Sequence, residues 1–250
     1  MAVIHWYGGG FTGGSKNAMA QTSRVYAERG YVAIAAQYRL ANQSPYPGLV
    51  HDAKAAIRWT RAHAKDLGIE PQRIAVAGYS AGGYLALFTA GTGKLPQFEG
   101  DGGNPGVSSE VAACLAYYPA GNITNALISP AGLSADERTA ANSATHIAAG
   151  FPPTIIFHGV ADATIRIESS QRMFQQFRDA GVPVEMHAYE GAAHGFDSTL
   201  ELAESCAQLA DLFMNRHILN PHTYPAFGAG RGGAGRGGNG AANAAGTPRA

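Results

Sequence analysis

The chain has 250 residues, 46% of them hydrophobic, a size that suits one α/β domain with a core of its own. Lysine and arginine total 18, as do aspartate and glutamate, so no net charge favours binding to nucleic acid or to an anionic membrane. No apolar run approaches the roughly 18 residues of a membrane span. The start Met-Ala-Val-Ile shows no signal peptide, so the sequence as it stands predicts a cytoplasmic protein.

Short apolar runs alternate with amphipathic stretches of helical length. The predicted strands are 3–6, 32–36, 74–77, 111–117, 154–158 and 184–189, and the predicted helices are 17–29, 49–66, 81–89, 167–180 and 198–217. Most of the strands lack polar alternation, which indicates burial on both faces. The pattern therefore predicts an α/β fold, with a mostly parallel sheet of about six strands flanked by helices.

Two longer stretches and the C-terminal tail lie outside this alternation. Residues 91–109 and 119–150 are predicted to be irregular, and neither is long enough for a large cap domain. Residues 228–250 are almost wholly Gly, Ala, Asn and Arg, so we expect a disordered tail after a folded catalytic domain over residues 1–227. Arg231 and Arg236 in this tail have no aromatic residue between them, a pattern that does not indicate nucleic-acid binding.

The motif Gly78-Tyr79-Ser80-Ala81-Gly82 lies between the third predicted strand and the third predicted helix. A G-x-S-x-G motif in this position is typical of a turn that exposes a nucleophilic serine. Small flanking residues are needed there because the strand and the helix approach each other closely. The alternative is a chance glycine-rich turn, so other residues must decide.

A serine hydroxyl needs a base to accept its proton, and a histidine needs an acid to hold its tautomer. His194 follows the last strand in a loop of small residues, and Asp162 follows the fifth strand, so both are expected at the carboxyl edge of the sheet. The order Ser80, Asp162, His194 along the chain is the order expected of a catalytic triad built on a parallel α/β sheet. His158 is predicted to hydrogen-bond its loop, and Glu168 is a weaker candidate for the acid.

The loop after the first strand is predicted to stabilise an oxyanion. We expect the amides of Gly8 and Gly9, with the amide of Ala81 at a helix start, to form the oxyanion hole. The alternative, a phosphate-binding glycine loop, lacks the G-K-[ST] ending of a nucleotide site.

Several motifs resemble those of the hormone-sensitive-lipase-like esterases of the α/β-hydrolase superfamily. They are Tyr7-Gly8-Gly9-Gly10-Phe11, Tyr38-Arg39-Leu40, Asp52-Ala53, Gly78 to Gly83, His158-Gly159 with Asp162, and His194-Gly195-Phe196. The small loops are similar to those of compact carbohydrate esterases that release acetyl or feruloyl groups. The resemblance implies the α/β-hydrolase fold, the same triad and oxyanion hole, no cofactor, no metal, and a small-molecule or saccharide ester as substrate.

The chain departs from this family in two places. Tyr7 stands where the family's glycine loop begins with histidine, and we expect it to brace the loop and alter rate or specificity. The family also has two strands before this loop that the chain lacks, so the strand 32–36 becomes an exposed edge. An exposed apolar edge strand predicts either low stability or a homodimer that covers it. The alternative is that the sequence is truncated at its N-terminus, in which case the native protein is expected to be secreted or periplasmic.

The predicted activity is serine carboxylic-ester hydrolysis through an acyl-enzyme, with short acyl groups favoured by the short loops. Two alternatives stay open. A serine peptidase of the same fold has the same triad in its sequence, and an inactive hydrolase-fold binding module is suggested by Tyr7 and the missing strands.

Overall fold

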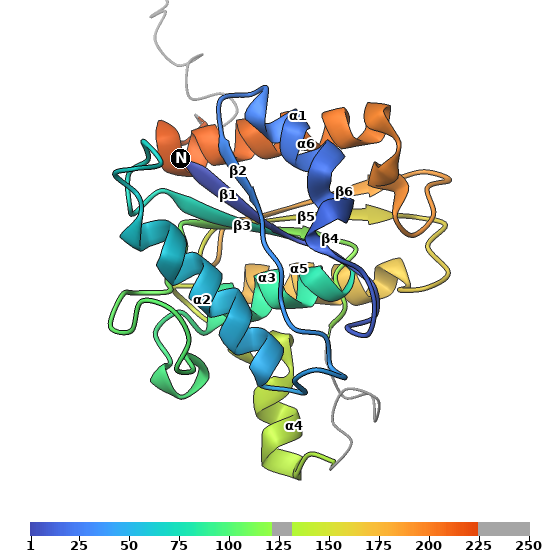
Figure 1. Cartoon of the computed structure of the whole chain (residues 1–250). Coiled ribbons are helices and arrows are strands. Elements are labelled where there is room, and N and C mark those ends of the chain that lie inside the picture. The colour runs from blue at the N-terminus through green and yellow to red at the C-terminus, as the bar shows by residue number, and fades with distance from the viewer. Residues whose placement is uncertain (122–131, 225–250) are drawn as a thin grey trace, which may run out of the picture.

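Parallel strands form the centre of the molecule in the computed structural model, which describes residues 1–121 and 132–224 (Figure 1). The strands are β1 (Ala2–Trp6), β2 (Val32–Ala35), β3 (Ile74–Tyr79), β4 (Ala113–Tyr117), β5 (Thr154–Gly159) and β6 (Val184–Tyr189). They form one six-stranded sheet in the order β2-β1-β3-β4-β5-β6, and every neighbouring pair is parallel. Because the strands are parallel, the loops that follow them all lie at the same edge of the sheet.

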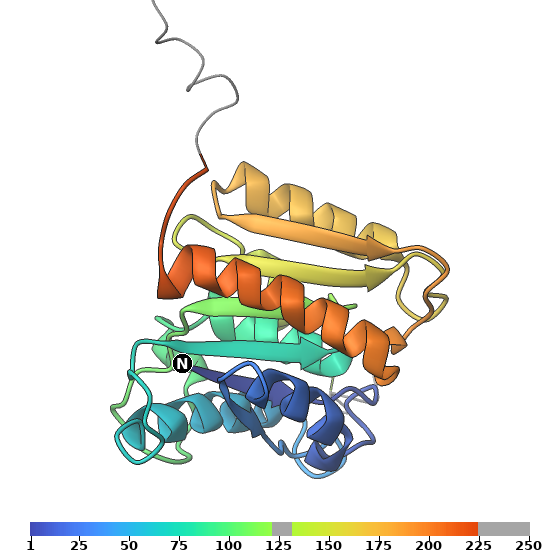
Figure 2. The same ribbon diagram turned by 90° about the horizontal axis from the view of Figure 1, so that it is seen from above.

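Helices cover both faces of this sheet (Figures 1 and 2). One face carries α1 (Ala20–Ala27) and α6 (Leu200–Met214). The other carries α2 (Gly48–Ala62), α3 (Ala81–Gly91) and α5 (Ile167–Asp179). Single 3-10 turns span Lys16–Met19, Pro96–Phe98, Ser143–His146 and Phe196–Ser198, and a π-helical turn, Asn215–Leu219, follows α6. Within the described ranges, none of the helices combines the length and the apolar character that a membrane span requires.

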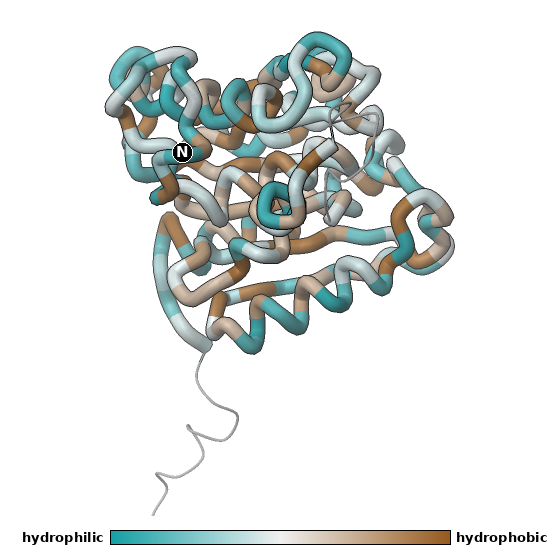
Figure 3. Tube along the Cα trace, turned by 90° about the horizontal axis from the view of Figure 1, so that it is seen from below, coloured by the Kyte–Doolittle hydropathy of each residue, from teal (hydrophilic) through white to brown (hydrophobic). Residues whose placement is uncertain are grey.

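The core lies along the middle of the sheet. All residues of β1, β3, β4 and β5 are buried. The residues of β2 and most residues of β6 are half-buried, because these two strands form the edges of the sheet. The hydropathy-coloured trace shows apolar segments gathered in the interior (Figure 3). The edge position predicted for the second strand is therefore confirmed. Dimerisation through this edge stays a prediction.

The predicted elements are all present, with shifts of a few residues at their ends. The stretch 119–150 was predicted to be irregular, and this is wrong where it contains α4 (Ala135–Ala141), while its residues 122–131 lie outside the described residues. Ser134 and Glu137 form a capping box, in which each side chain bonds the backbone of the other. The predicted domain end at residue 227 and the predicted disordered tail lie outside the described residues.

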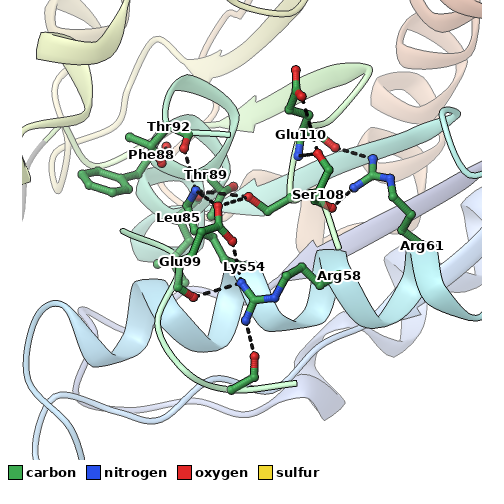
Figure 4. Close-up of polar contacts among 12 residues, drawn as sticks. Lys54, Arg58, Arg61, Leu85, Phe88, Thr89, Thr92, Glu99, Ser108 and Glu110 are labelled. Carbon is green, nitrogen blue, oxygen red and sulfur yellow. Dashed lines mark hydrogen bonds and ion pairs between the residues drawn. The ribbon is translucent and has the colours of Figure 1, made fainter. Parts of the chain in front are cut away.

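A buried lysine joins α2 to the stretch between α3 and β4 (Figure 4). Lys54 Nζ donates to the Thr92 carbonyl (2.6 Å), Glu99 Oε1 (2.8 Å) and Ser109 Oγ (3.1 Å). Arg58 donates to the other carboxylate oxygen of Glu99 at 2.6 Å. Burial alone would raise the pKa of the Glu99 carboxyl, but the bonds from Lys54 and Ser109 and the neighbouring positive charge hold that pKa below its usual range. This carboxylate therefore forms ion pairs with two buried cations.

Replacing Glu99 with glutamine is expected to lower the free energy of unfolding by about 3 kcal/mol, because the Lys54 charge then stays buried without its anion. Urea denaturation measures this change. The control is Glu110→Gln, which removes an exposed pair with Lys94 at 3.5 Å and should cost under about 0.5 kcal/mol. Equal losses in the two variants would contradict the role given to Glu99.

Candidate active site

Ser80 occupies the sharp turn between β3 and α3. Its backbone has φ 56° and ψ −113°, a left-handed conformation that is strained for a residue with a side chain. A methyl group on Gly78 would overlap the carbonyl oxygen of Gly82, and one on Gly82 would overlap the carbonyl oxygen of Trp6. A methyl group on Gly83 would stand 2.7 Å from the Cα atom of Pro119. The glycines of the motif are therefore required by close backbone packing around the serine.

The structure brings Ser80, His194 and Asp162 together. His194 Nε2 lies 2.9 Å from Ser80 Oγ, and His194 Nδ1 lies 2.7 Å from Asp162 Oδ2. Because an ionised carboxylate only accepts hydrogen bonds, Nδ1 carries the proton and Nε2 is free to accept one from the serine hydroxyl. Three loops at the carboxyl edge of the sheet thus place a hydroxyl, an imidazole and a carboxylate in one hydrogen-bonded chain.

Asp162 is held as an anion by its own loop. The carboxylate is buried, and its second oxygen accepts the amide N–H groups of Thr164 and Ile165, each at 2.8 Å. Burial raises the pKa of this carboxyl, but the hydrogen bonds from His194 and from the two amides outweigh it and hold the pKa below its usual range. Glu168, the other candidate acid, is exposed in the first turn of α5 and makes no hydrogen bond to His194 among the described residues.

His158 hydrogen-bonds its loop, as predicted. Its Nε2 donates to the Ile165 carbonyl at 2.8 Å, and its Nδ1 therefore accepts from the Ser170 hydroxyl at 2.7 Å. Burial is the main cause of a lowered pKa for this imidazole, so it stays neutral. His158 Nε2 also lies 3.4 Å from Asp162 Oδ2. This histidine thus fixes the loop that carries Asp162.

The glycine loop after β1 lies directly against the serine. A methyl group on Gly8 would stand 3.0 Å from the Cβ atom of Ser80. Gly9 has φ 125°, and its carbonyl accepts the amide of Gly13 at 3.0 Å, so the loop folds back on itself. The amides of Gly8, Gly9 and Ala81 have no hydrogen-bond acceptor among the described residues. All three predicted oxyanion donors are therefore free to bind a ligand oxygen within the described part of the chain, and Gly8 and Ala81 lie next to the serine.

Tyr7 braces this loop through Tyr38. The Tyr7 hydroxyl donates to the Tyr38 carbonyl at 3.1 Å, and the Tyr38 hydroxyl donates to the Tyr7 carbonyl at 2.9 Å. The two rings stack with centroids 4.4 Å apart, and Gln37 donates to the Tyr7 hydroxyl at 2.6 Å. The tyrosine in place of histidine thus supports the loop, as expected from the sequence.

Sequence reasoning missed two further residues at the site. The Tyr118 ring lies edge-on to the imidazole of His194, with centroids 4.6 Å apart. The hydroxyl of Tyr118 donates to the buried carboxylate of Asp197. Their positions in the sequence indicate a place near the site only weakly: Tyr118 directly follows β4, and Asp197 comes three residues after His194.

Within residues 1–121 and 132–224, no group of three or more His, Cys, Asp or Glu side chains is placed to hold a metal ion. The chemistry visible at this edge of the sheet is that of a hydroxyl, an imidazole, a carboxylate and backbone amides. The expectation of catalysis without a cofactor stays a prediction.

Comparisons with known proteins agree with this geometry. Residues 1–177 match the family described as BD-FAE. The probable carboxylic ester hydrolase LipM of Mycobacterium tuberculosis is 27% identical over 240 residues, which cover 84% of this chain and 54% of LipM. Esterase LipI of the same organism is 30% identical over 217 residues, which cover 78% of this chain and 65% of LipI. The chain thus spans about half to two thirds of the length of these relatives.

The chain covers a larger share of a similar esterase whose structure has been solved. Esterase 2 of Thermogutta terrifontis with propionate bound has a TM-score of 0.74 and 34% identity, covering 89% of this chain and 85% of that one. The same esterase phosphorylated by paraoxon has a TM-score of 0.76 and 33% identity, covering 89% and 84%.

Proposed function

The chain belongs to the BD-FAE family, and from this premise we propose that it is a serine carboxylic-ester hydrolase. Family membership and the likeness to a solved esterase confirm the α/β-hydrolase fold and the esterase resemblance predicted from the motifs. The observation that carries the proposed mechanism is the hydrogen-bonded chain through His194, at 2.9 Å to Ser80 and 2.7 Å to Asp162.

The reaction proceeds through an acyl-enzyme. Ser80 Oγ attacks the ester carbonyl carbon while His194 Nε2 takes the hydroxyl proton, and the histidine then gives this proton to the departing alcohol. A water molecule, activated by the same imidazole, releases the acid and restores the serine. Asp162 stays ionised throughout, fixes the tautomer of His194 and stabilises the imidazolium that forms.

The amides of Gly8, Gly9 and Ala81 bind the oxygen that becomes negative in the attack. They suit this task because Gly8 packs against Ser80, Gly9 and Ala81 directly follow Gly8 and Ser80, and none of the three amides has an acceptor among the described residues. Each such donor typically contributes about 3 kcal/mol to transition-state stabilisation.

We propose short acyl groups as the preferred substrates, including acetyl or feruloyl esters of carbohydrate. Esterase 2 of Thermogutta terrifontis, which is 34% identical, has been solved with propionate bound and also with butyrate bound, and these are two short acids. A serine peptidase of the same fold and an inactive binding module are the alternatives. The assembled hydrogen bonds of His194 favour an active enzyme over the inactive module.

Two measurements on the full chain test this proposal. Hydrolysis of p-nitrophenyl acetate, without cleavage of an aminoacyl p-nitroanilide, is expected for an esterase and not for a peptidase. A fluorophosphonate probe should label Ser80 and leave Ser80→Ala unlabelled, whereas no hydrolysis and no labelling would indicate a binding module. Release of acid from acetylated xylan and from methyl ferulate then tests the carbohydrate substrates.

A further inference from the structure

The loop that carries His194 is held by backbone hydrogen bonds at its start, where the Ala161 amide donates to the Ala192 carbonyl at 3.0 Å, whereas Ala193 and His194 make no backbone hydrogen bond among the described residues. It runs from Gly191 to Gly195, and both glycines adopt left-handed backbone conformations, with φ 67° and 76°. The residues between them are His194 and two alanines, Ala192 and Ala193, whose side chains offer no polar anchor. The bonds of the imidazole to Ser80 and Asp162 orient the ring, but they require that the loop is already in place.

Tyr118 contacts this loop in two ways. Its ring edge packs on the His194 imidazole at a centroid distance of 4.6 Å and an interplanar angle of 61°. Its hydroxyl donates to Asp197, which lies in the 3-10 turn Phe196–Ser198 immediately after the loop. The same ring also packs against Phe196, with centroids 5.6 Å apart. One side chain thus restrains the imidazole itself and the turn that ends its loop.

Tyr118 is itself rigidly placed. Its amide donates to the Phe157 carbonyl at 2.7 Å, which continues the pairing of β4 with β5 beyond the end of the strand. Its backbone has φ 34°, a conformation that residues with side chains rarely adopt, so the surrounding structure must impose it. The ring is buried and lies 6.4 Å from the ring of Tyr79, the residue before the serine. The hydroxyl therefore presents a fixed point to the histidine loop.

Burial of the Asp197 carboxylate makes its hydrogen bond to Tyr118 costly to break. This carboxylate is buried, and burial is the largest cause of the raised pKa of this group. The hydroxyl of Tyr118 is its one side-chain donor among the described residues. Without the Tyr118 hydroxyl, this buried carboxylate would keep the hydrogen bond from its own backbone amide and lose its side-chain donor, which is costly, so the turn cannot move away from Tyr118 without that cost.

We propose that Tyr118 and Asp197 form a hydrogen-bonded pair that positions His194 between Ser80 and Asp162. This inference rests on the proposed esterase function, and both members act as positioning residues through the loop and the ring contact. A displacement of the imidazole by about 1 Å is enough to lower a rate by up to about 100-fold, so loss of the pair should slow the chemical step. Substrate binding does not use the imidazole, so KM should change little.

Steady-state hydrolysis of p-nitrophenyl acetate by four variants tests the pair. Tyr118→Phe, which keeps the ring and removes the hydroxyl, is expected to lower kcat about tenfold with KM within about twofold of wild type. Asp197→Ala should have a similar effect, and the double variant should be no slower than about the slower single variant, because the two residues act as one unit. Asp197→Asn still offers an oxygen to Tyr118 and should retain most of the activity.

Tyr31→Phe is the matched control. The Tyr31 hydroxyl donates to Asp211 at 2.5 Å, so it is also a tyrosine paired with an aspartate. It precedes β2 and lies at the opposite, amino edge of the sheet. This control should lower the melting temperature without changing kcat. A proton NMR signal for His194 Nδ1–H should also stay sharp in Tyr31→Phe and Asp197→Asn and broaden in Tyr118→Phe.

The kcat values and the NMR signal of these variants together support or overturn the positioning role of the pair. Wild-type kcat in Tyr118→Phe with an unchanged NMR signal overturns the proposal, as does an equal loss of kcat in Tyr31→Phe. If Tyr118→Phe does not fold, Asp197→Ala and Asp197→Asn replace it, and equal kcat values in those two variants overturn the proposal. Failure of the wild-type chain to hydrolyse esters would instead defeat the proposed function.

Discussion

Replacing Ser80 with alanine is expected to lower kcat for p-nitrophenyl acetate by about 10⁶-fold, which is typical of removing the nucleophile of a triad. The hydroxyl is the atom that forms the acyl-enzyme, and no other hydroxyl among the described residues hydrogen-bonds His194. KM should change little, since the oxyanion donors and the rest of the site remain.

The matched control is Ser169→Ala. The Ser169 hydroxyl donates to the Arg166 carbonyl at the start of α5 and makes no hydrogen bond to the triad among the described residues. Its kcat should equal that of the wild type. Ser80→Ala should keep the wild-type melting temperature within a few degrees, because the backbone strain at φ 56° is the same for alanine and serine. Residual ester hydrolysis at a tenth of the wild-type rate would assign the nucleophile elsewhere.

The strands and the serine turn were predictable because their causes are local. A strand buried on both faces requires a continuous apolar run, as in Ile74–Tyr79. The turn at Ser80 requires glycines wherever backbone approaches backbone, and Gly78 and Gly82 stand there in the sequence. The positions of Asp162 and His194 followed from one topological fact, that parallel strands deliver their following loops to one edge.

The features that were missed have other causes. The helix Ala135–Ala141 is too short to show apolar periodicity, and its capping box at Ser134 and Glu137 was the only local signal. The bond between Tyr118 and Asp197 joins residues 79 positions apart, and nothing near either residue indicates the other. Such contacts depend on the order β4-β5-β6 and on the path of the histidine loop, which a single sequence does not reveal.

Replacing Asp162 with asparagine is expected to lower kcat about 10⁴-fold while the chain stays folded. The backbone amides of Thr164 and Ile165 bond one carboxylate oxygen, so the oxygen of asparagine should occupy that place. The amide NH₂ group then faces His194 Nδ1, which must become the acceptor. Nε2 therefore carries the proton and can no longer take the one from Ser80.

Glu168→Gln is the control and should leave kcat unchanged, because this carboxylate is exposed and makes no hydrogen bond to the imidazole among the described residues. The reverse result, a large loss in Glu168→Gln and a small one in Asp162→Asn, would transfer the role of the acid to Glu168, since only the true partner of Nδ1 controls which nitrogen is protonated.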